Sequence, residues 1–381
     1  MLRGALWGIT LSSAIVLVSC TAAGKDAAPA TTQPIPAVVL SSNPTPGATA
    51  VPLDQKIQVA VANGTLKTVT LASPAGTVKG VVAPGATSWE SALPLQPTTT
   101  YQVQAALVDT VGHVSNKQWE FTTAAPTKLF RATLYPADGV VGVGMPMTIS
   151  LNTPVPVARQ AAFESLLTVT TTPAVAGAWH WFSPTSLHWR PATYWAPGTT
   201  VSVVAHINGY NAGNNIWGAK DVSVNYAIGD SHVSTVDANT HTMTVAVNGA
   251  AVKTIAVSTG RDKYPTKSGV HVVSTKAPKV IMDSATVGIP RASPDGYYET
   301  VLWDVRISNS GEFVHAAPWS VGDQGHTNVS HGCVNVSTAD AVWFYNFSQV
   351  GDVVNVVGTS EALEPTNGYG DWQIPWASWA N

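Results

Sequence analysis

Charge and cysteine are both scarce in this 381-residue sequence. Charged residues make up 11% of the chain, and 19 Lys and Arg against 22 Asp and Glu leave a formal net charge of -3. So little positive charge gives no electrostatic reason to expect a nucleic-acid partner. Cysteine occurs only as Cys20 and Cys333, so Cys333 has no possible disulfide partner other than Cys20.

Long apolar runs are also rare. After the first 20 residues, no segment reaches the length that a membrane-spanning helix needs. Within them, Arg3 is followed by an apolar stretch over residues 5–18 that ends in Leu17-Val18-Ser19-Cys20. A short positive start and a short apolar stretch are typical of a signal peptide, and the ending resembles the bacterial lipobox, in which the cysteine is lipid-modified.

The lipobox interpretation predicts a lipoprotein signal peptide over residues 1–19 and an exported protein. Acyl chains on Cys20 would anchor it to the cell membrane on the side facing the periplasm and cell wall. The alternative is a plain signal peptide with an incidental cysteine. If Cys20 is acylated, Cys333 is an unpaired thiol in an oxidising compartment, which is a liability unless it performs chemistry.

What the chain does contain favours short strands joined by turns: 31 Gly and 26 Pro, with many Thr and Val. After a linker over residues 20–35, alternating strand patterns at residues 56–61 and 101–105 return at residues 148–151 and 201–204. This repeat predicts two β-sandwich modules, over residues 36–125 and 126–229, which resemble bacterial immunoglobulin-like domains.

A third region, residues 230–358, also reads as mostly β, with little helix. Asn248-Gly249 between alternating strands predicts a hairpin with a type I′ turn. Further strands are expected at residues 270–274, 300–307 and 353–357, and a short helix at 339–347 with Ser337 or Thr338 as its cap. The fold class is therefore mainly β, with a Trp-rich tail over residues 359–381 that is expected to pack onto a domain.

The chemistry centres on His315 and on the run Ser330-His331-Gly332-Cys333-Val334-Asn335. A cysteine nucleophile needs a base to form thiolate, a group that orients the base, and donors aimed at the oxyanion. Gly332 lets the backbone approach a substrate closely. His315, this gap and this run resemble the signature of the L,D-transpeptidase (YkuD-type) family, and the two upstream modules and the tail resemble its mycobacterial branch.

The resemblance implies a role for each site residue. Cys333 would be the nucleophile and His315 its general base, oriented by the carbonyl of Ala316. The amides of Gly332 and Cys333 would form the oxyanion hole. Tyr297 would be a third oxyanion donor, and His331 would shape the environment of the cysteine. Asn335 would hold the loop or a substrate amide, and Ser330 belongs to the motif itself. Met282 and Trp319 would line the pocket, and residues 281–298 would form a flap that covers the substrate.

Plainer interpretations stand beside these. Cys333 could be a small buried hydrophobe, and His315, His331 and Cys333 could bind zinc, although no Cys-x-x-Cys or close His pair supports a metal. Tyr297 could simply be packed, and Asn335 could be a turn residue. The Trp cluster at positions 179, 181, 189 and 195 could stack on sugars, but sandwich packing is the stronger expectation.

The predicted function is formation of 3→3 cross-links in peptidoglycan. Cys333 would take the acyl group of a tetrapeptide stem, release D-Ala, and pass the acyl group to the amine of a second stem, without metal or cofactor. The resemblance also implies acylation by carbapenem β-lactams. Water as the acceptor would give a carboxypeptidase, attachment of proteins to the wall is a further variant, and a sortase or a catalytically dead wall-binding spacer are the rival classes.

Overall fold

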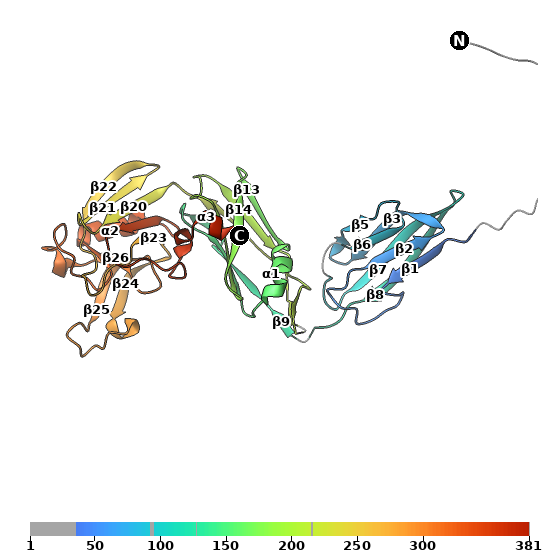
Figure 1. Cartoon of the computed structure of the whole chain (residues 1–381), viewed down its shortest axis with the longest axis horizontal. Coiled ribbons are helices and arrows are strands. Elements are labelled where there is room, and N and C mark those ends of the chain that lie inside the picture. Colours follow the sequence, from blue (N-terminus) through green and yellow to red (C-terminus); the bar gives the residue numbers. More distant parts are fainter. Residues whose placement is uncertain (1–35, 92–94, 127, 215, 381) are drawn as a thin grey trace, which may run out of the picture.

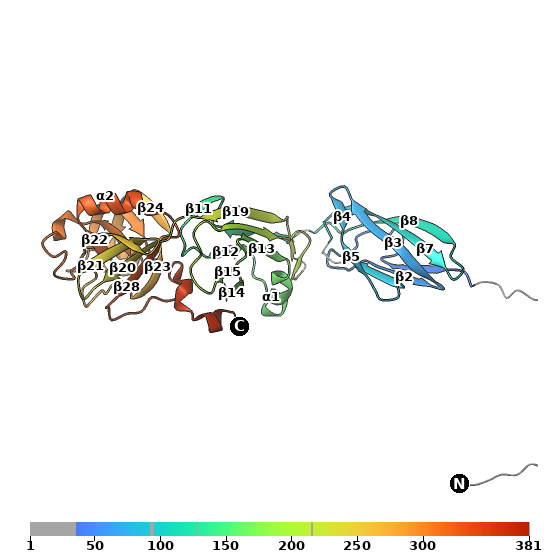
Figure 2. The same ribbon diagram turned by 90° about the horizontal axis from the view of Figure 1, so that it is seen from above.

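The computed structural model describes residues 36–91, 95–126, 128–214 and 216–380. Within them the chain forms three β-rich units in a row, with the first unit at one end and the third at the other (Figure 1). The same order is seen from a perpendicular direction (Figure 2). No helix in this part of the chain has both the length and the apolar character needed to cross a membrane.

The first unit is a sandwich of two four-stranded sheets, ordered β1-β2-β6-β5 and β4-β3-β7-β8. Alternate residues of β7 are buried, from Tyr101 to Leu107, so one face of this strand lies in the core as its sequence pattern predicts. The strands of the unit are β1 (Val39–Asn43), β2 (Gln58–Ala62), β3 (Gly64–Ser73), β4 (Gly76–Val78), β5 (Gly80–Val82), β6 (Ser88–Ser91), β7 (Thr100–Asp109) and β8 (Val114–Thr122).

The second unit is another sandwich, with sheets β10-β12-β15-β14 and β11-β19-β16-β13 and a small sheet β17-β18-β9. Trp189 and Trp195 are buried in its core and Trp179 and Trp181 pack against it, as expected for sandwich packing. Its elements are β9 (Lys128–Phe130), β10 (Ala132–Tyr135), β11 (Gly139–Val141), β12 (Met147–Leu151), α1 (Val157–Glu164), β13 (Leu167–Thr172), β14 (Gly177–Ser183), β15 (Ser186–Pro191), β16 (Thr200–Ala205), β17 (Asn211–Gly213), β18 (Ile216–Gly218) and β19 (Val222–Ile228).

The third unit combines a five-stranded sheet, β22-β21-β20-β28-β23, with a four-stranded sheet, β24-β25-β26-β27. Val and Ile side chains from both sheets share one core with Ala341 and Phe344 of α2. Its elements are β20 (His232–Asp237), β21 (Thr242–Val247), β22 (Ala250–Ala256), β23 (Gly269–Val272), β24 (Thr275–Asp283), β25 (Tyr298–Arg306), β26 (Phe313–Ala316), β27 (Val334–Val336), α2 (Thr338–Phe347) and β28 (Val353–Val357), with single 3-10 turns η1 (Ser284–Val287) and η2 (Pro318–Ser320).

Two local predictions in this unit are confirmed. Asn248 and Gly249 both have positive φ, 49° and 85°, as a type I′ turn between β21 and β22 requires. Helix α2 begins at Thr338, and the side chain of Ser337 accepts a hydrogen bond from Asp340 N, so Ser337 is the N-cap.

The second and third units pack closely against each other. Gly142 N donates to Val350 O and Gly144 N to Gly351 O, both at 2.8 Å. A Cβ atom on Gly142 would lie 2.3 Å from Asp352 N, so this backbone approach requires glycine. Val353 of β28 belongs to the core of the second unit, which makes the contact between the units apolar as well as hydrogen-bonded.

The C-terminal tail returns from the third unit to the second (Figure 1). It carries η3 (Gly370–Gln373) and α3 (Trp376–Trp379). The guanidinium of the buried Arg190 on β15 lies 4.6, 5.5 and 4.3 Å from the ring centroids of Trp372, Trp376 and Trp379. Arg190 also donates to Ile374 O at 2.7 Å. The tail therefore packs onto a domain, as predicted.

Replacing Arg190 with alanine should release the tail. The variant loses a buried cation surrounded by three indoles, and we expect the second unit to lose about 2–4 kcal/mol of stability. Thermal melting should show a lower transition, and limited proteolysis should cut within residues 359–380 faster than in the wild type. Arg131→Ala, at an exposed arginine of the same unit, is the matched control. Unchanged protection of the tail would contradict this account.

Candidate active site

The pairing of β26 with β27 brings the predicted catalytic side chains to one face of a sheet. The two strands are parallel, and His315 lies opposite Asn335. Their neighbours Val314, Val334 and Val336 are buried in the core. Because side chains alternate along a strand, His315 and Asn335 point to the other face, and Cys333, just before β27, shares it.

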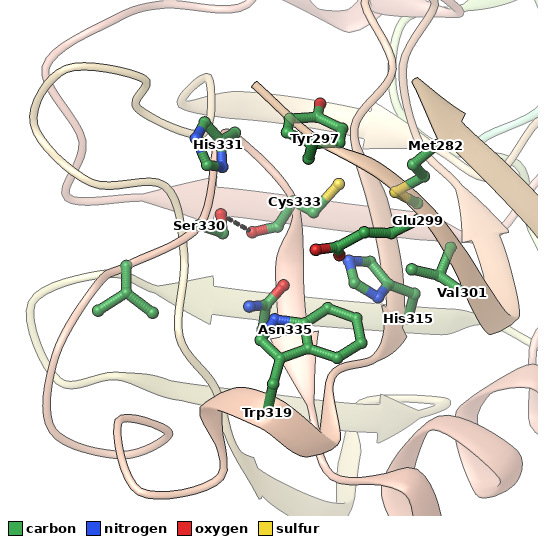
Figure 3. A pocket seen from close by; sticks show the side chains of 11 residues that line it. Met282, Tyr297, Glu299, Val301, His315, Trp319, Ser330, His331, Cys333 and Asn335 are labelled. Atoms are coloured by element: carbon green, nitrogen blue, oxygen red, sulfur yellow. Dashed lines mark hydrogen bonds between the residues drawn. The ribbon is translucent and has the colours of Figure 1, made fainter. Parts of the chain in front are cut away.

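On that face lies a pocket with a volume of about 240 Å³ (Figure 3). Ala316 and Gly332 do not line it, so their predicted contribution is confined to backbone atoms. The other predicted catalytic and substrate-binding residues all do, together with three that were not predicted; the lining consists of Met282, Tyr297, Glu299, Val301, His315, Trp319, Val329, Ser330, His331, Cys333 and Asn335.

The imidazole of His315 is fixed by the next backbone carbonyl. Its Nδ1 lies 3.0 Å from Ala316 O. Since a carbonyl only accepts hydrogen bonds, Nδ1 carries the proton, and Nε2 of the neutral ring is left as a proton acceptor. Burial lowers the pKa of His315, only partly opposed by the Ala316 hydrogen bond. His315 is therefore a neutral imidazole at neutral pH, oriented as the resemblance implies.

Cys333 rests as a neutral thiol. Its Sγ lies 3.6 Å from Gly311 O, to which it donates, and no hydrogen bond joins it to His315 within the described residues. Burial raises the pKa of Cys333 to about 12, and the carboxyl groups of Glu312 and Asp304 act in the same direction. The thiolate is thus not the resting form, because a desolvated site penalises the anion, and a base is needed to form it.

The loop before Cys333 is held by two hydroxyls. Ser330 Oγ donates to Cys333 O at 2.6 Å and accepts from Gly332 N at 3.1 Å. Thr266 Oγ1 donates to Gly332 O at 2.8 Å. Gly332 has φ of +122°, a conformation that other residues rarely adopt. Without a substrate, its N–H donates to Ser330 Oγ, whereas no hydrogen bond of Cys333 N–H or of the Tyr297 hydroxyl is seen among the described residues, so the predicted oxyanion roles of all three donors stay predictions.

Asn335 and Trp319 both line the pocket. Asn335 Nδ2 donates to Ser320 Oγ at 3.1 Å, and its backbone N and O pair with Ser258 at 2.9 and 3.0 Å. Of its two predicted roles, holding the loop matches these contacts. Trp319 is 57% exposed, with its ring centroid 6.0 Å from that of His315. An exposed indole beside the imidazole of His315 offers an apolar surface to a ligand.

His331 is tied to a charged cluster at the pocket edge. Arg261 Nη2 donates to His331 Nε2 at 2.8 Å, and Arg261 also forms an ion pair with Asp295. Burial, then the charge of Arg261, lowers the pKa of His331, so the ring stays neutral. Among the described residues, no group of three or more His, Cys, Asp or Glu side chains is arranged to hold a metal ion.

Hydrogen bonds between Ser284 and Tyr297 join the two ends of the predicted flap. Ser284 N donates to Tyr297 O, and Tyr297 N donates to Ser284 Oγ, both at 3.0 Å. Asp283 pairs with Arg291 and also caps η1 by accepting from Ala285 N. The Arg291 pair, aided by the Ala285 hydrogen bond, lowers the pKa of Asp283 to about 2. These contacts hold Met282 and Tyr297 over the pocket.

Several site residues were not predicted. Glu299 and Val301 follow Tyr297 at every second position of β25, so strand alternation from Tyr297 could have found them. The Arg261–Asp295 pair left no such signal, because the two residues lie in separate loops that meet only in the fold.

Comparisons with known proteins agree with this order along the chain, in which sandwich modules precede the unit that holds the cysteine and histidine. Residues 48–211 match the family model of a bacterial Ig domain, and residues 231–356 match that of the L,D-transpeptidase catalytic domain. The chain is 40% identical to L,D-transpeptidase 2 of Mycobacterium tuberculosis, over 89% of this chain and 83% of that protein. L,D-transpeptidase 5 of the same species is 35% identical, over 96% of this chain and 81% of the relative.

Solved structures agree as well. An L,D-transpeptidase in complex with imipenem superposes with a TM-score of 0.52 at 37% identity, covering 59% of this chain and 97% of that one. L,D-transpeptidase 3 from Mycobacterium tuberculosis, with a faropenem-derived adduct, gives a TM-score of 0.50 at 33% identity, with 59% and 97% covered. The chain belongs to the L,D-transpeptidase family.

One buried carboxyl lies close enough to the site to affect the thiol. On β25, Leu302 pairs with Ala316 but Val305 with Val314, so one extra residue forms a bulge, and Trp303 there has φ of 62°. The next side chain, Asp304, is 1% exposed, and neither carboxyl oxygen has a hydrogen-bond partner. Burial raises the pKa of Asp304 to about 7.

The raised pKa of Asp304 predicts a loss of stability as the pH rises. The folded protein keeps this proton up to about pH 7, whereas the unfolded chain loses it near pH 4. The native state binds more protons in this window, so the contribution of Asp304 to stability is fully present below pH 4 and is lost as the pH rises through 7. Asp304→Asn cannot ionise, and at pH 8 the variant should be more stable than the wild type by on the order of 2–3 kcal/mol.

The measurement is thermal melting of both proteins from pH 4 to pH 8, with the exposed Asp262→Asn as the control for loss of a carboxylate in the same unit. The gap between the wild type and Asp304→Asn should widen with pH, and the gap for the control should stay constant. Parallel curves for all three proteins would show that Asp304 is already ionised in the fold.

Proposed function

We propose that this L,D-transpeptidase cross-links peptidoglycan stems through an acyl-enzyme on Cys333. The observation that carries the proposal is the position of Cys333 and His315 in one pocket, with His315 Nδ1 bonded 3.0 Å from Ala316 O. That bond leaves Nε2 available as a base. The family identity supports the reaction class, and the geometry supports the residue roles.

In the first half-reaction, Cys333 attacks the carbonyl of the third, diamino-acid residue of a tetrapeptide stem. Because the thiol and the imidazole are both neutral at rest, the proton passes from Sγ to His315 Nε2 as the C–S bond forms. Cys333 N–H and the half-buried Tyr297 hydroxyl stabilise the oxyanion. His315 then returns the proton to the departing amine of D-Ala, which leaves a thioester.

In the second half-reaction, the side-chain amine of another stem attacks the thioester and forms a 3→3 cross-link. We also propose that carbapenems acylate Cys333, since relatives with 37% and 33% identity have been solved with imipenem and with a faropenem-derived adduct. A strained β-lactam carbonyl presents the same electrophile as the stem peptide, so it requires the same pocket.

A purified disaccharide-tetrapeptide should report the function directly. Mass analysis of the products should show a cross-linked dimer formed with loss of one D-Ala. Cys333→Ala should give no dimer, and His315→Ala should slow the reaction by roughly 10²–10⁴-fold, the usual contribution of a general base. Intact mass after carbapenem exposure should show one adduct on the wild type and none on Cys333→Ala.

Asn116→Ala, at an exposed position of β8 in the first unit, is a control that should retain full activity. Tripeptide as the sole product would instead indicate a carboxypeptidase. Binding to peptidoglycan without any turnover would indicate a dead enzyme that only binds the wall. A carbapenem adduct on Cys333→Ala would exclude this cysteine as the nucleophile.

We further propose that the protein is a lipoprotein anchored through Cys20, with the sandwich modules as spacers. Cys20 lies outside the described residues. The order of the units supports the spacer role, because the first unit, which follows the anchor in sequence, lies at the opposite end from the third (Figure 1). Such an arrangement would carry the catalytic unit away from the membrane towards the wall.

The anchor can be tested by replacing its acceptor. In bacterial cells, Cys20→Ala should abolish labelling by a radioactive or clickable fatty acid and move the protein from the membrane fraction to the soluble fraction, since two or more acyl chains are needed for stable anchoring. Cys333→Ala should keep both the label and the membrane location. Equal labelling of Cys20→Ala and wild type would refute lipidation at this residue.

A further inference from the structure

Glu299 supplies the only carboxyl group among the residues that line the pocket. Of the eleven lining residues drawn in Figure 3, the others are apolar, amide or hydroxyl side chains or groups held neutral. Burial keeps the imidazoles of His315 and His331 uncharged by lowering their pKa. Burial raises the pKa of Cys333 and Tyr297 to about 12 each, so both stay protonated. Glu299 is therefore the side chain of the lining that is best suited to attract a cationic ligand.

This carboxylate has no partner among the described residues. Glu299 is exposed and makes no hydrogen bond or ion pair there, and Figure 3 shows its carboxylate pointing into the pocket beside Cys333 and His315. Three cationic side chains of the flap and the pocket edge are paired with other carboxylates. Arg291 pairs with Asp283, whereas Arg261 and Lys263 both pair with Asp295.

The backbone fixes where the carboxylate stands. Glu299 lies on β25 between Tyr297 and Val301, and it pairs with Met282 of β24 across an antiparallel ladder. All four residues line the pocket. The backbone of a paired strand is more rigid than that of a loop. The carboxylate of Glu299 can therefore bind a positive charge at a defined position in the pocket.

The donor stem and the acceptor stem differ in the chemical group that each would place near Glu299. The donor presents a carbonyl, whereas the acceptor presents a side-chain amine, which is an ammonium ion at neutral pH. We propose that Glu299 binds the ammonium group of the acceptor stem and so determines which nucleophile reaches the thioester. This inference rests on the proposed function, and it assigns the acceptor as a cationic primary amine rather than water or a neutral nucleophile.

The step balances with groups already present. The bound ammonium gives one proton to water, and the free amine forms a bond to the thioester carbonyl carbon while the bond from that carbon to Cys333 Sγ breaks. A second proton passes from nitrogen to His315 Nε2 and then to the leaving thiolate. The products are an amide and the Cys333 thiol. Glu299 raises the local concentration of the acceptor, and His315 moves the proton.

The test is Glu299→Gln in the full chain, with disaccharide-tetrapeptide as donor and acceptor. We expect the KM for the acceptor to rise about fivefold and the ratio of dimer to hydrolysed tripeptide to fall about fivefold, which is typical of one partly exposed ion pair. The difference from wild type should shrink as salt is added, because salt screens exposed charges. With hydroxylamine, an uncharged nucleophile at neutral pH, the partition between aminolysis and hydrolysis should match that of the wild type.

Glu361→Gln is the matched control, since it removes an exposed carboxylate of the tail outside the pocket while Lys267 keeps Glu364 as a partner. A partition ratio for Glu299→Gln equal to that of the wild type would overturn the inference. So would an equal fall with hydroxylamine, because that would indicate a general disturbance of the pocket. Absence of dimer from the wild type itself would overturn the proposed function, and the two failures are therefore distinguishable.

Discussion

The site depends on the parallel pairing of two short strands. β26 and β27 put His315 opposite Asn335, and the same register buries the valines on either side of them. A slip of one residue would move the imidazole into the core and a valine into the pocket. The apolar core between the sheets and α2 therefore fixes the catalytic face, and catalytic geometry and stability are set by the same residues.

Burial has a second consequence, which concerns protonation. The pocket that holds the thiol and the imidazole in register also desolvates them, so the pKa of Cys333 is raised and that of His315 is lowered. A preformed thiolate–imidazolium pair is disfavoured in such a site, and in the proposed mechanism charge develops only as a substrate carbonyl accepts the sulfur. Donors aimed at the oxyanion then contribute most, since charge is absent in the ground state and present in the transition state.

Much of this could be predicted from local sequence. The Ser-His-Gly-Cys run with His315 predicts residues that do meet in one pocket, Asn248-Gly249 predicts the hairpin, and Ser337 is the predicted cap of α2. These signals succeed because each depends on residues close in the chain or on a very specific motif. The commitment of Gly332 N–H to Ser330 Oγ could not be predicted, since it depends on the conformation of the whole loop.

Contacts between segments that are distant in the sequence were harder to predict. Three such features have no recognisable motif in the sequence around them. They are the bulge that buries Asp304, the ion pair of Arg261 with Asp295, and the indoles around Arg190. Glu299 is an intermediate case, because alternation places it beside Tyr297 once the strand boundary is known. A charged residue at an alternating strand position is usually solvent-facing, and only the flap turns this one towards a pocket.

The tail adds a constraint on how the units move. Trp372 Nε1 donates to Gly144 O at 2.8 Å, and Gln373 Nε2 donates to Val270 O of β23 at 3.1 Å, so adjacent tail residues bind both the second and the third units. Val353 of β28 contributes to the core of the second unit, and β28 lies in the sheet that packs behind the catalytic sheet. The second sandwich therefore supports the catalytic unit directly. Loosening it would disturb the core on which the register of β26 and β27 depends.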